Sequence, residues 1–225
     1  MVPAMQPTLS LAVFDLVPVI IAGVAFVTLA RLITAKNPDL AIPAMAGAVL
    51  ATTGGASKAI WKVIKAASDG DIDITVMEEA LFPLLSVGFA LMAMSLFLLR
   101  EEGKPLVSGL VLVGIIWGIA VGLSFVSEGA VNGYFITVVT LAEVTLIMLL
   151  WRWARREGAH IGWLLGFHLF LVIGLSGMAR AVEQTNALQW VEESANAVTQ
   201  ALLLVAVFRL KDAITARTTE TADVT

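Results

Sequence analysis

A Glu-Glu pair opens each of two long apolar runs, with Glu79 as the second member of one pair and Glu193 as the second member of the other. On a helix with 100° per residue, Glu193, Asn196 and Gln200 fall within about 60° of one another. Carboxylates hold cations or protons, and amides orient polar ligands through hydrogen bonds. The pattern therefore indicates binding chemistry on one face of an apolar helix.

Ionisable groups on other apolar runs lie at a similar depth. Depth is counted along each helix at about 1.5 Å per residue, starting from the end that we predict to be cytoplasmic. On this count Asp15 and Glu193 both lie at a depth of about 24 Å. Lys58 and Arg180 lie at about 27 to 28 Å, and Glu79 lies at the outer boundary. Charged groups at such depth usually face the bundle interior or a watery cavity. We predict a shared polar cavity; the alternative is that long side chains reach the headgroups and short polar ones bond neighbouring helices.

Glu193 is the residue for which the pattern makes the sharpest prediction. We expect it to face the bundle interior and to pair with Lys58 or Arg180. Glu192 is expected at the outer aqueous edge instead, because adjacent helical residues point 100° apart.

Glu143 stands alone in an apolar run, about 13 Å along its helix from Arg152 and therefore close to mid-bilayer. A carboxylate at this depth costs roughly a few kcal/mol, so it needs a partner or a proton. Two interpretations stay open for Glu143: a neutral hydrogen bond between helices, and a relay for protons or cations.

Cofactor and metal sites are not expected. The chain has no Cys and two His, His160 and His168. They are separated by about 12 Å along one helix, which is too far for both to hold one iron from opposite faces. A seven-helix zinc hydrolase of the ceramidase or adiponectin-receptor kind needs more His ligands. An intramembrane hydrolase is therefore the least favoured function, and we assign no catalytic residue.

Composition places the chain in the membrane class. Of its 225 residues, 59% are hydrophobic and 14% are charged, and the mean hydropathy is +0.91. A soluble domain is nearer one quarter charged. The lipid bilayer is the expected partner, and no basic patch for nucleic acid is visible. The first ten residues hold no Lys or Arg, so we predict no cleavable signal peptide.

Seven apolar runs reach the length of about 20 residues that a membrane span requires. They lie at 12–34, 40–64, 78–100, 105–127, 132–153, 161–182 and 189–210. We therefore predict an all-α membrane domain over 1–211, followed by a disordered cytoplasmic tail at 212–225. In the fourth run Gly114, Gly118 and Gly122 repeat every four residues, which favours close helix contact.

The distribution of cations predicts the orientation. Ten of the fourteen Lys and Arg lie in the C-terminal tail and in the connections that share its side of the membrane. The positive-inside rule then places the C-terminus in the cytoplasm and the N-terminus outside. We expect a multi-pass protein of a cell membrane, in particular the cytoplasmic membrane of a prokaryote.

The first and last three runs match in order, as a parallel three-helix unit used twice. Repeat A covers about 12–100, a linker helix 105–127, and repeat B about 132–210. The matched residues are Arg31 with Arg152, Lys58 with Arg180, and Glu79 with Glu193. The alternative is that apolar helices always align and that the positive-inside rule alone places charges at their ends.

This 3+1+3 plan resembles the architecture of microbial rhodopsins, and SWEET-type sugar transporters share it. The resemblance covers most of the chain and implies a seven-helix fold. It does not extend to retinal, because the seventh run has no Lys between Ala195 and Arg209 where microbial rhodopsins hold the chromophore. The PQ dipeptides of the SWEET relatives are absent as well.

We therefore expect a protein that binds a polar or cationic ligand, or protons, in an outward-facing intramembrane cavity, as a sensor or a transporter. Asp15, Glu79 and Glu193 would bind, Lys58 and Arg180 would balance charge, Asn196 and Gln200 would orient the ligand, and Glu143 would relay protons. The alternative is a non-catalytic subunit or scaffold of a larger complex. The sequence leaves open whether the partner is another protein or a second copy of the chain.

Overall fold

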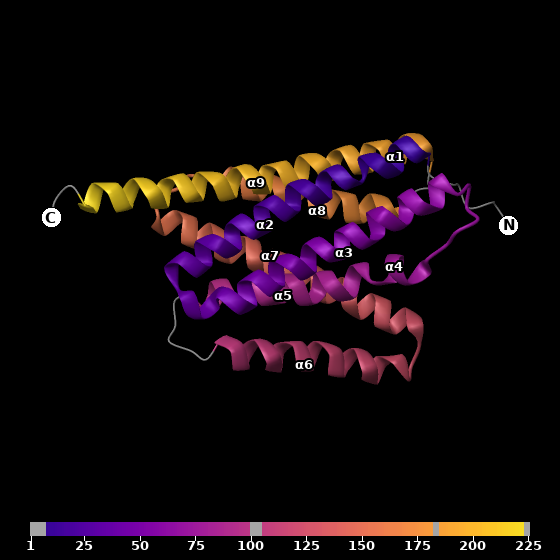
Figure 1. Ribbon diagram of the computed structural model, residues 1–225, viewed down its shortest axis with the longest axis horizontal. Helices are drawn as coiled ribbons and strands as arrows, with labels where there is room; N and C mark the ends of the chain where they lie inside the picture. Colours follow the sequence, from indigo (N-terminus) through magenta and orange to yellow (C-terminus); the bar gives the residue numbers. More distant parts are fainter. Residues whose placement is uncertain (1–7, 100–104, 182–184, 223–225) are drawn as a thin grey trace.

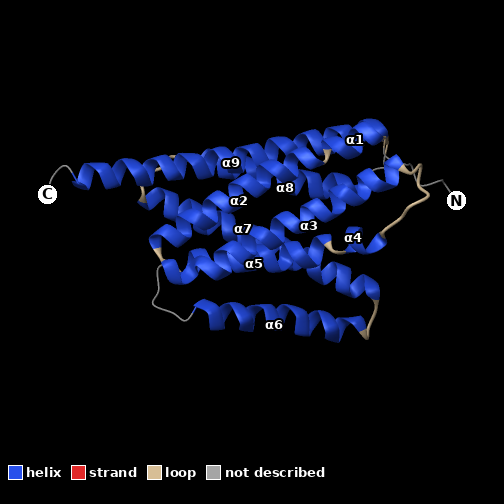
Figure 2. Ribbon diagram, viewed as in Figure 1, coloured by secondary structure: helices blue, strands red, loops and turns tan. Residues whose placement is uncertain are grey.

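A computed structural model describes residues 8–99, 105–181 and 185–222, and of 105–106, 176–181 and 220–222 it describes the backbone only. The described residues form helices and no strands (Figure 2). The helices are α1 (Leu9–Phe14), α2 (Leu16–Lys36), the 3-10 helix η1 (Pro38–Leu40), α3 (Ala41–Ala67), α4 (Thr75–Glu79), α5 (Leu81–Leu98), α6 (Pro105–Ser124), α7 (Glu128–Arg156), α8 (Gly162–Ala181) and α9 (Asn186–Ala222).

Five helical segments among the described residues are long and apolar enough to cross a membrane. They are Leu9–Lys36, Pro38–Ala67, Thr75–Leu98, Val107–Ser124 and Glu128–Arg156. The apolar part of α8, Gly162–Leu175, is shorter. The prediction of helices without strands is thus confirmed for the described residues, and five of the predicted spans have candidate membrane helices. The sixth and seventh spans, the orientation and the repeat stay predictions.

The long helices lie side by side and run alternately up and down the molecule (Figure 1). Helix α1 contacts both α3 and α9, and α2 packs along α9. Because the directions alternate, the start of α2, the end of α3 and the start of α9 meet at one end of the bundle (Figure 1). We call this the α1 end.

Helix α3 is held firmly against α5 by glycines on both helices. A Cβ added to Gly88 would lie 2.6 Å from the backbone nitrogen of Ala51, and one added to Gly47 would lie 2.8 Å from the carbonyl oxygen of Gly88. Real Cβ atoms do not approach backbone so closely, so the two helices need glycine at both positions to pack at this distance. This packing fixes the position of α3 and of the lysines near its end.

The first apolar run contains a break that its hydropathy does not show. Asp15 lies between α1 and α2, and its backbone N–H donates to the carbonyl oxygens of Leu11 and Val13. The Asp15 side chain makes no capping hydrogen bond to α2, although the residue is only 7% exposed. Its carboxylate therefore points to partners on other helices.

Helix α6 differs from the prediction of close packing through its glycines. A Cβ added to Gly114, Gly118 or Gly122 would meet nothing within 4 Å. The helix instead uses the opposite face, where Ile116 and Ala120 are both 4% exposed and pack in a cluster with α5 and α7. The three glycines therefore lie on a face of α6 that contacts no other helix among the described residues, and the prediction of close packing through them is wrong within this chain.

The expected disorder of 212–225 does not hold for 212–222, because α9 continues to Ala222. Its last turns project beyond the other helices (Figure 1). The Thr215 and Thr218 hydroxyls each donate to the carbonyl oxygen four residues back, at 3.0 Å. Arg217 Nη1 lies 3.5 Å from a Glu157 carboxylate oxygen at the end of α7. Continuation of an already formed helix and this link to α7 offset the low helix propensity of the Thr-rich segment.

Candidate ligand-binding cavity

A cavity of about 570 Å³ lies between α2, α3, α5, α7, α8 and α9. Its lining along α2 extends from Asp15 to Phe26, which is about 16 Å of helix. The charged and amide residues that line it are Asp15, Lys58, Lys62, Glu143, Glu192, Glu193, Asn196 and Gln200. Polar groups from four sequence-distant segments therefore share one cavity.

An ion cluster of Asp15, Lys62 and Glu193 forms the wall of the cavity at the α1 end. Lys62 Nζ lies 2.7 Å from Asp15 Oδ2 and 2.8 Å from Glu193 Oε1. The three side chains are 21%, 10% and 14% exposed for Lys62, Asp15 and Glu193 respectively. One ammonium thus holds two carboxylates that are both largely withdrawn from solvent, and ion pairs of this kind are strongest where water is excluded.

Three separate elements bring this ion cluster together. Asp15 comes from the α1–α2 junction, Lys62 from the penultimate turn of α3, and Glu193 from the second turn of α9. The ring centres of Phe14 and Trp190 lie 5.3 Å apart and pack the junction against α9. This aromatic contact holds the two carboxylates on either side of the lysine.

The observed partner of Glu193 differs from the predicted one. We expected Lys58 or Arg180, but Glu193 pairs with Lys62, and the side chain of Arg180 lies outside the described part of the chain. Lys58 lines the cavity one turn before Lys62 and interacts electrostatically with Asp15 and Glu193. The i,i+4 spacing of the two lysines on one helix face was the signal that could have identified Lys62.

Two amides continue the polar lining deeper along α9. Gln200 Nε2 donates to Asn196 Oδ1 at 3.4 Å. Gln200 Oε1 is buried and has no hydrogen-bond partner among the described residues. A buried acceptor left without a donor costs about 1–3 kcal/mol. A donor in the cavity, from water or from a ligand, would satisfy it.

The predicted central carboxylate, Glu143, also lines the cavity, and it has a partner that sequence reasoning missed. His168 Nε2 lies 3.3 Å from Glu143 Oε1, and His168 Nδ1 lies 2.9 Å from the carbonyl oxygen of Thr199. His168 and Thr199 are both fully buried. The sequence contained a signal for this pair, because a mid-bilayer carboxylate requires a partner and His168 lies well inside the next helix.

Aromatic and aliphatic side chains form the rest of the wall. Phe26 and Phe89 meet edge to face with ring centres 5.5 Å apart, and both line the cavity. Phe82, Leu85 and Val139 line it as well. Aromatic faces in a cavity that also contains carboxylates suit an organic cation, since the ring quadrupole attracts positive charge.

Two glutamates do not lie where the pattern predicted. Glu79 is exposed at the end of the short helix α4 and does not line the cavity. The reason is that α4 ends at Glu79 and α5 begins as a separate helix at Leu81, so the pair and the apolar run do not form one straight helix. Glu192, which was expected at the outer aqueous edge, lines the cavity together with Glu193.

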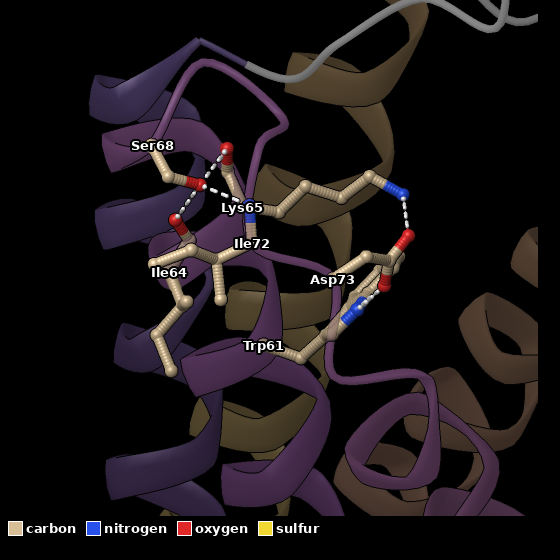
Figure 3. Close-up of polar contacts among 6 residues, drawn as sticks. All are labelled: Trp61, Ile64, Lys65, Ser68, Ile72 and Asp73. Carbon is tan, nitrogen blue, oxygen red and sulfur yellow. Dashed lines mark hydrogen bonds and ion pairs between the residues drawn. The ribbon is translucent and has the colours of Figure 1, made fainter.

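A second cluster, Trp61, Lys65 and Asp73, lies just beyond the cavity at the loop between α3 and α4; we call it the loop cluster (Figure 3). Asp73 Oδ2 accepts from Lys65 Nζ and Asp73 Oδ1 accepts from Trp61 Nε1, both at 2.7 Å. The hydrogen bond from Lys65, followed by that from Trp61, lowers the pKa of Asp73 below its ordinary value of 3.8.

A tight turn brings Asp73 back to α3. Gly70 has φ of 89° and its N–H donates to the carbonyl oxygen of Lys65 at 2.8 Å. The Ser68 hydroxyl donates to the carbonyl oxygen of Ile64 at 2.9 Å and accepts from the N–H of Ile72 at 3.1 Å (Figure 3). These contacts stop α3 and reverse the chain, as is typical of helix ends with a left-handed glycine.

Six of the eight predicted site residues thus line one cavity, while Glu79 lies outside it and the side chain of Arg180 is outside the described residues. Within the described residues no group of three or more His, Asp or Glu is arranged to hold a metal ion. A comparison with models of protein families finds no match, and comparisons with curated proteins and with solved structures find none either.

Proposed function

We propose that this chain is a polytopic membrane protein that binds a polar or cationic ligand in the cavity, as a sensor or a transporter. The observation that carries the proposal is the position of the ion cluster: two carboxylates share the Lys62 ammonium directly at the wall of a cavity of about 570 Å³. A cation that enters this cavity competes with Lys62 for the carboxylates, so ligand binding and helix contacts are linked.

The composition of the wall favours a ligand with positive charge or with hydrogen-bond donors. Four carboxyl groups line the cavity, from Asp15, Glu143, Glu192 and Glu193, against two ammonium groups. The buried Gln200 Oε1 requires a donor. Phe26 and Phe89 line the same cavity, so its wall also offers aromatic contacts to an organic ammonium.

The proposal includes the topology in which the cavity would work. Seven spans would place the α1 end and the cavity outside, with the C-terminus in the cytoplasm, in a cell membrane that we expect to be prokaryotic. The alternating directions of the long helices support this topology (Figure 1). A reporter fused after Thr225 should be active in the cytoplasm; maturation outside the cell alone would contradict the orientation.

The parallel repeat is the second architectural part of the proposal. Residues 12–100 should superpose on 132–210 about an axis near the membrane normal, which brings Glu79 onto Glu193. A superposition that needs an inverted axis would rule out the parallel 3+1+3 plan and its likeness to microbial rhodopsins.

Thermal unfolding of the purified protein in detergent tests the ligand class. Ammonium, methylammonium, tetramethylammonium and choline chlorides are titrated against sodium chloride at equal ionic strength. We expect at least one organic cation to raise the Tm with saturation. Glu193→Gln should weaken that binding roughly tenfold or more, because one charge-assisted contact is lost.

Glu79→Gln is the matched control, since it removes an exposed carboxylate outside the cavity from the same kind of Glu-Glu pair. It should leave the affinity unchanged. The proposal fails if no cation in the series exceeds sodium chloride. It also fails if Glu79→Gln weakens binding as much as Glu193→Gln does.

A further inference from the structure

The Glu143–His168 contact lies apart from the ion cluster and joins three helices at the inner part of the cavity. Glu143 belongs to α7, His168 to α8, and the carbonyl oxygen that His168 contacts belongs to Thr199 of α9. The Glu143 side chain is 14% exposed and lines the cavity, whereas the His168 side chain is 1% exposed. The carboxyl group is therefore the side of this pair that meets the cavity.

Hydrogen-bond chemistry fixes one proton of the imidazole. The Thr199 carbonyl oxygen, 2.9 Å from Nδ1, can only accept a hydrogen bond. Nδ1 of His168 therefore carries a proton. With Nδ1 protonated, a neutral His168 presents a lone pair on Nε2 toward Glu143, and an imidazolium presents an N–H.

The contact between Nε2 and Oε1, at 3.3 Å, then requires one more proton. If Glu143 is protonated, its O–H donates to Nε2 of a neutral imidazole. If Glu143 is ionised, an imidazolium Nε2–H donates to the carboxylate. Without this proton the Nε2 lone pair, on a side chain that is only 1% exposed, would face a carboxylate oxygen at 3.3 Å, which is unfavourable.

We propose that Glu143 and His168 form a proton-binding site at the cavity wall that holds one exchangeable proton between them. In uptake, a hydronium ion in the cavity transfers its proton to the Glu143 carboxylate and leaves water. The same O–H then donates to His168 Nε2 or passes its proton to that nitrogen. Release follows the reverse path, and exchange proceeds through Glu143 because His168 is closed to the cavity.

Charged groups around the site set the conditions in which the proton leaves. Helices α5 and α6 contribute no charged residue over their described lengths, and His168 is the sole ionisable side chain between Gly162 and Leu175. The groups that face the same cavity are Asp15, Lys58 and Lys62 from α2 and α3, with Glu192 and Glu193 from α9. A change in their charge acts on the shared proton through the low-dielectric cavity.

The proton site goes beyond the proposed ligand binding and does not depend on which ligand the ion cluster takes. Its test uses the full-length protein in detergent with 15N-labelled histidine. His160→Ala removes the exposed second histidine, so that the nitrogen spectrum reports His168 alone. Infrared spectra of the same sample, in H₂O and in D₂O, detect the C=O stretch of a protonated carboxyl group.

At neutral pH we expect one of two results, and both support the site. Either a carboxyl band that shifts in D₂O accompanies a neutral His168 protonated at Nδ1, or an imidazolium accompanies an ionised Glu143. An ionised Glu143 beside a neutral His168 at neutral pH would overturn the proposal, as would a carboxyl band that does not respond to D₂O.

Two variants assign the signals. Glu143→Gln keeps a hydrogen-bond donor for Nε2 and removes the exchangeable proton, so the carboxyl band or the imidazolium should disappear. Glu157→Gln, directly after the end of the same helix, is the matched control, because Glu157 contacts Lys36, Trp153 and Arg217 and does not line the cavity. It should leave both spectra of the pair unchanged. A Glu143→Gln protein with wild-type spectra would also overturn the proposal. If Glu143→Gln does not fold, the nitrogen and infrared spectra of the protein that keeps Glu143 still test the proposal.

Discussion

Lys62 and Lys65 lie three residues apart on α3, and each holds a carboxylate at 2.7 Å. Their partners differ in origin. Lys62 joins Asp15 of the α1–α2 junction to Glu193 of α9, which is 131 residues away along the chain. Lys65 holds Asp73, which is eight residues away in the adjoining loop.

The two clusters differ in the exposure of their acids rather than of their lysines. The lysine side chains are 21% and 27% exposed for Lys62 and Lys65, but the acids of the ion cluster are 10% and 14% exposed against 43% for Asp73. Water can replace Lys65 around Asp73, whereas it has poor access to Asp15 and Glu193. The two ion pairs have equal N–O distances, but their loss should cost unequal amounts of stability. The cost depends on whether water can solvate the remaining charge after its partner is removed.

Lys62→Met gives the largest expected effect. It leaves two carboxylates near each other without their cation, and removal of one member of a buried ion pair costs about 3–5 kcal/mol. We expect the lower end, about 3 kcal/mol, because Lys62 keeps some solvent contact. Thermal or SDS-induced unfolding in detergent measures the change.

Lys65→Met is the matched control on the same helix. It removes the same charge and keeps a similar apolar stem, but it leaves Asp73 in contact with water. Its unfolding should stay within the error of the wild-type measurement. Equal losses in the two variants would mean that the ion cluster is solvated as well as the loop cluster is.

A double-mutant cycle of Asp15→Asn and Glu193→Gln gives the next largest effect. Each single substitution leaves Lys62 with one carboxylate and should cost about 1–2 kcal/mol. The double variant leaves a partly buried ammonium without an acid, so its cost should exceed the sum of the two by about 1 kcal/mol. Additive costs would show that the two carboxylates do not share the lysine in solution.

The sequence was sufficient to predict the class of fold and much of the cavity lining. Hydropathy located the helical runs, and the depth count grouped Asp15, Lys58 and Glu193 at one level. The face of α9 that carries Asn196 and Gln200 does line the cavity. These features depend on helix rise and periodicity, which the sequence fixes locally.

Features that depend on bends and on packing between helices could not be predicted in the same way. Lys62 was not predicted as a site residue, because its contacts with Asp15 and Glu193 depend on how α3 packs against the α1–α2 junction and α9. The separation of α4 from α5 moved Glu79 away from the cavity. The Glu143–His168 pair required the side-by-side placement of α7 and α8, which periodicity does not determine.

Asp73→Asn should have a smaller and local effect. It removes the ionic contact with Lys65 and weakens the hydrogen bond from Trp61, but Ser68 still holds the turn through Ile64 and Ile72. We expect faster backbone hydrogen exchange in 68–74 with an unchanged Tm. Exchange that also rises at Glu193 on α9 would show that the loop cluster supports the ion cluster and that the two are not independent.

The smallest expected effect is the pH response of the loop cluster. The pKa of the Asp73 carboxyl is lowered from 3.8, first by the hydrogen bond from Lys65 and then by that from Trp61. The folded loop therefore binds this proton less readily than the unfolded chain does. The contribution of Asp73 to stability is fully present above pH 3.8 and is lost as the pH falls through the lower folded pKa.

The indole N–H resonance of Trp61 can follow this transition, since that group donates to Asp73 at 2.7 Å. Its shift should change with a midpoint below 3.8, and Asp73→Asn should abolish the change. High salt should raise the midpoint toward 3.8, because an exposed ion pair is screened. A midpoint at or above 3.8 would mean that solvent, not Lys65, stabilises the carboxylate. Lys62 and Lys65 would then differ only in the number of carboxylates that each contacts.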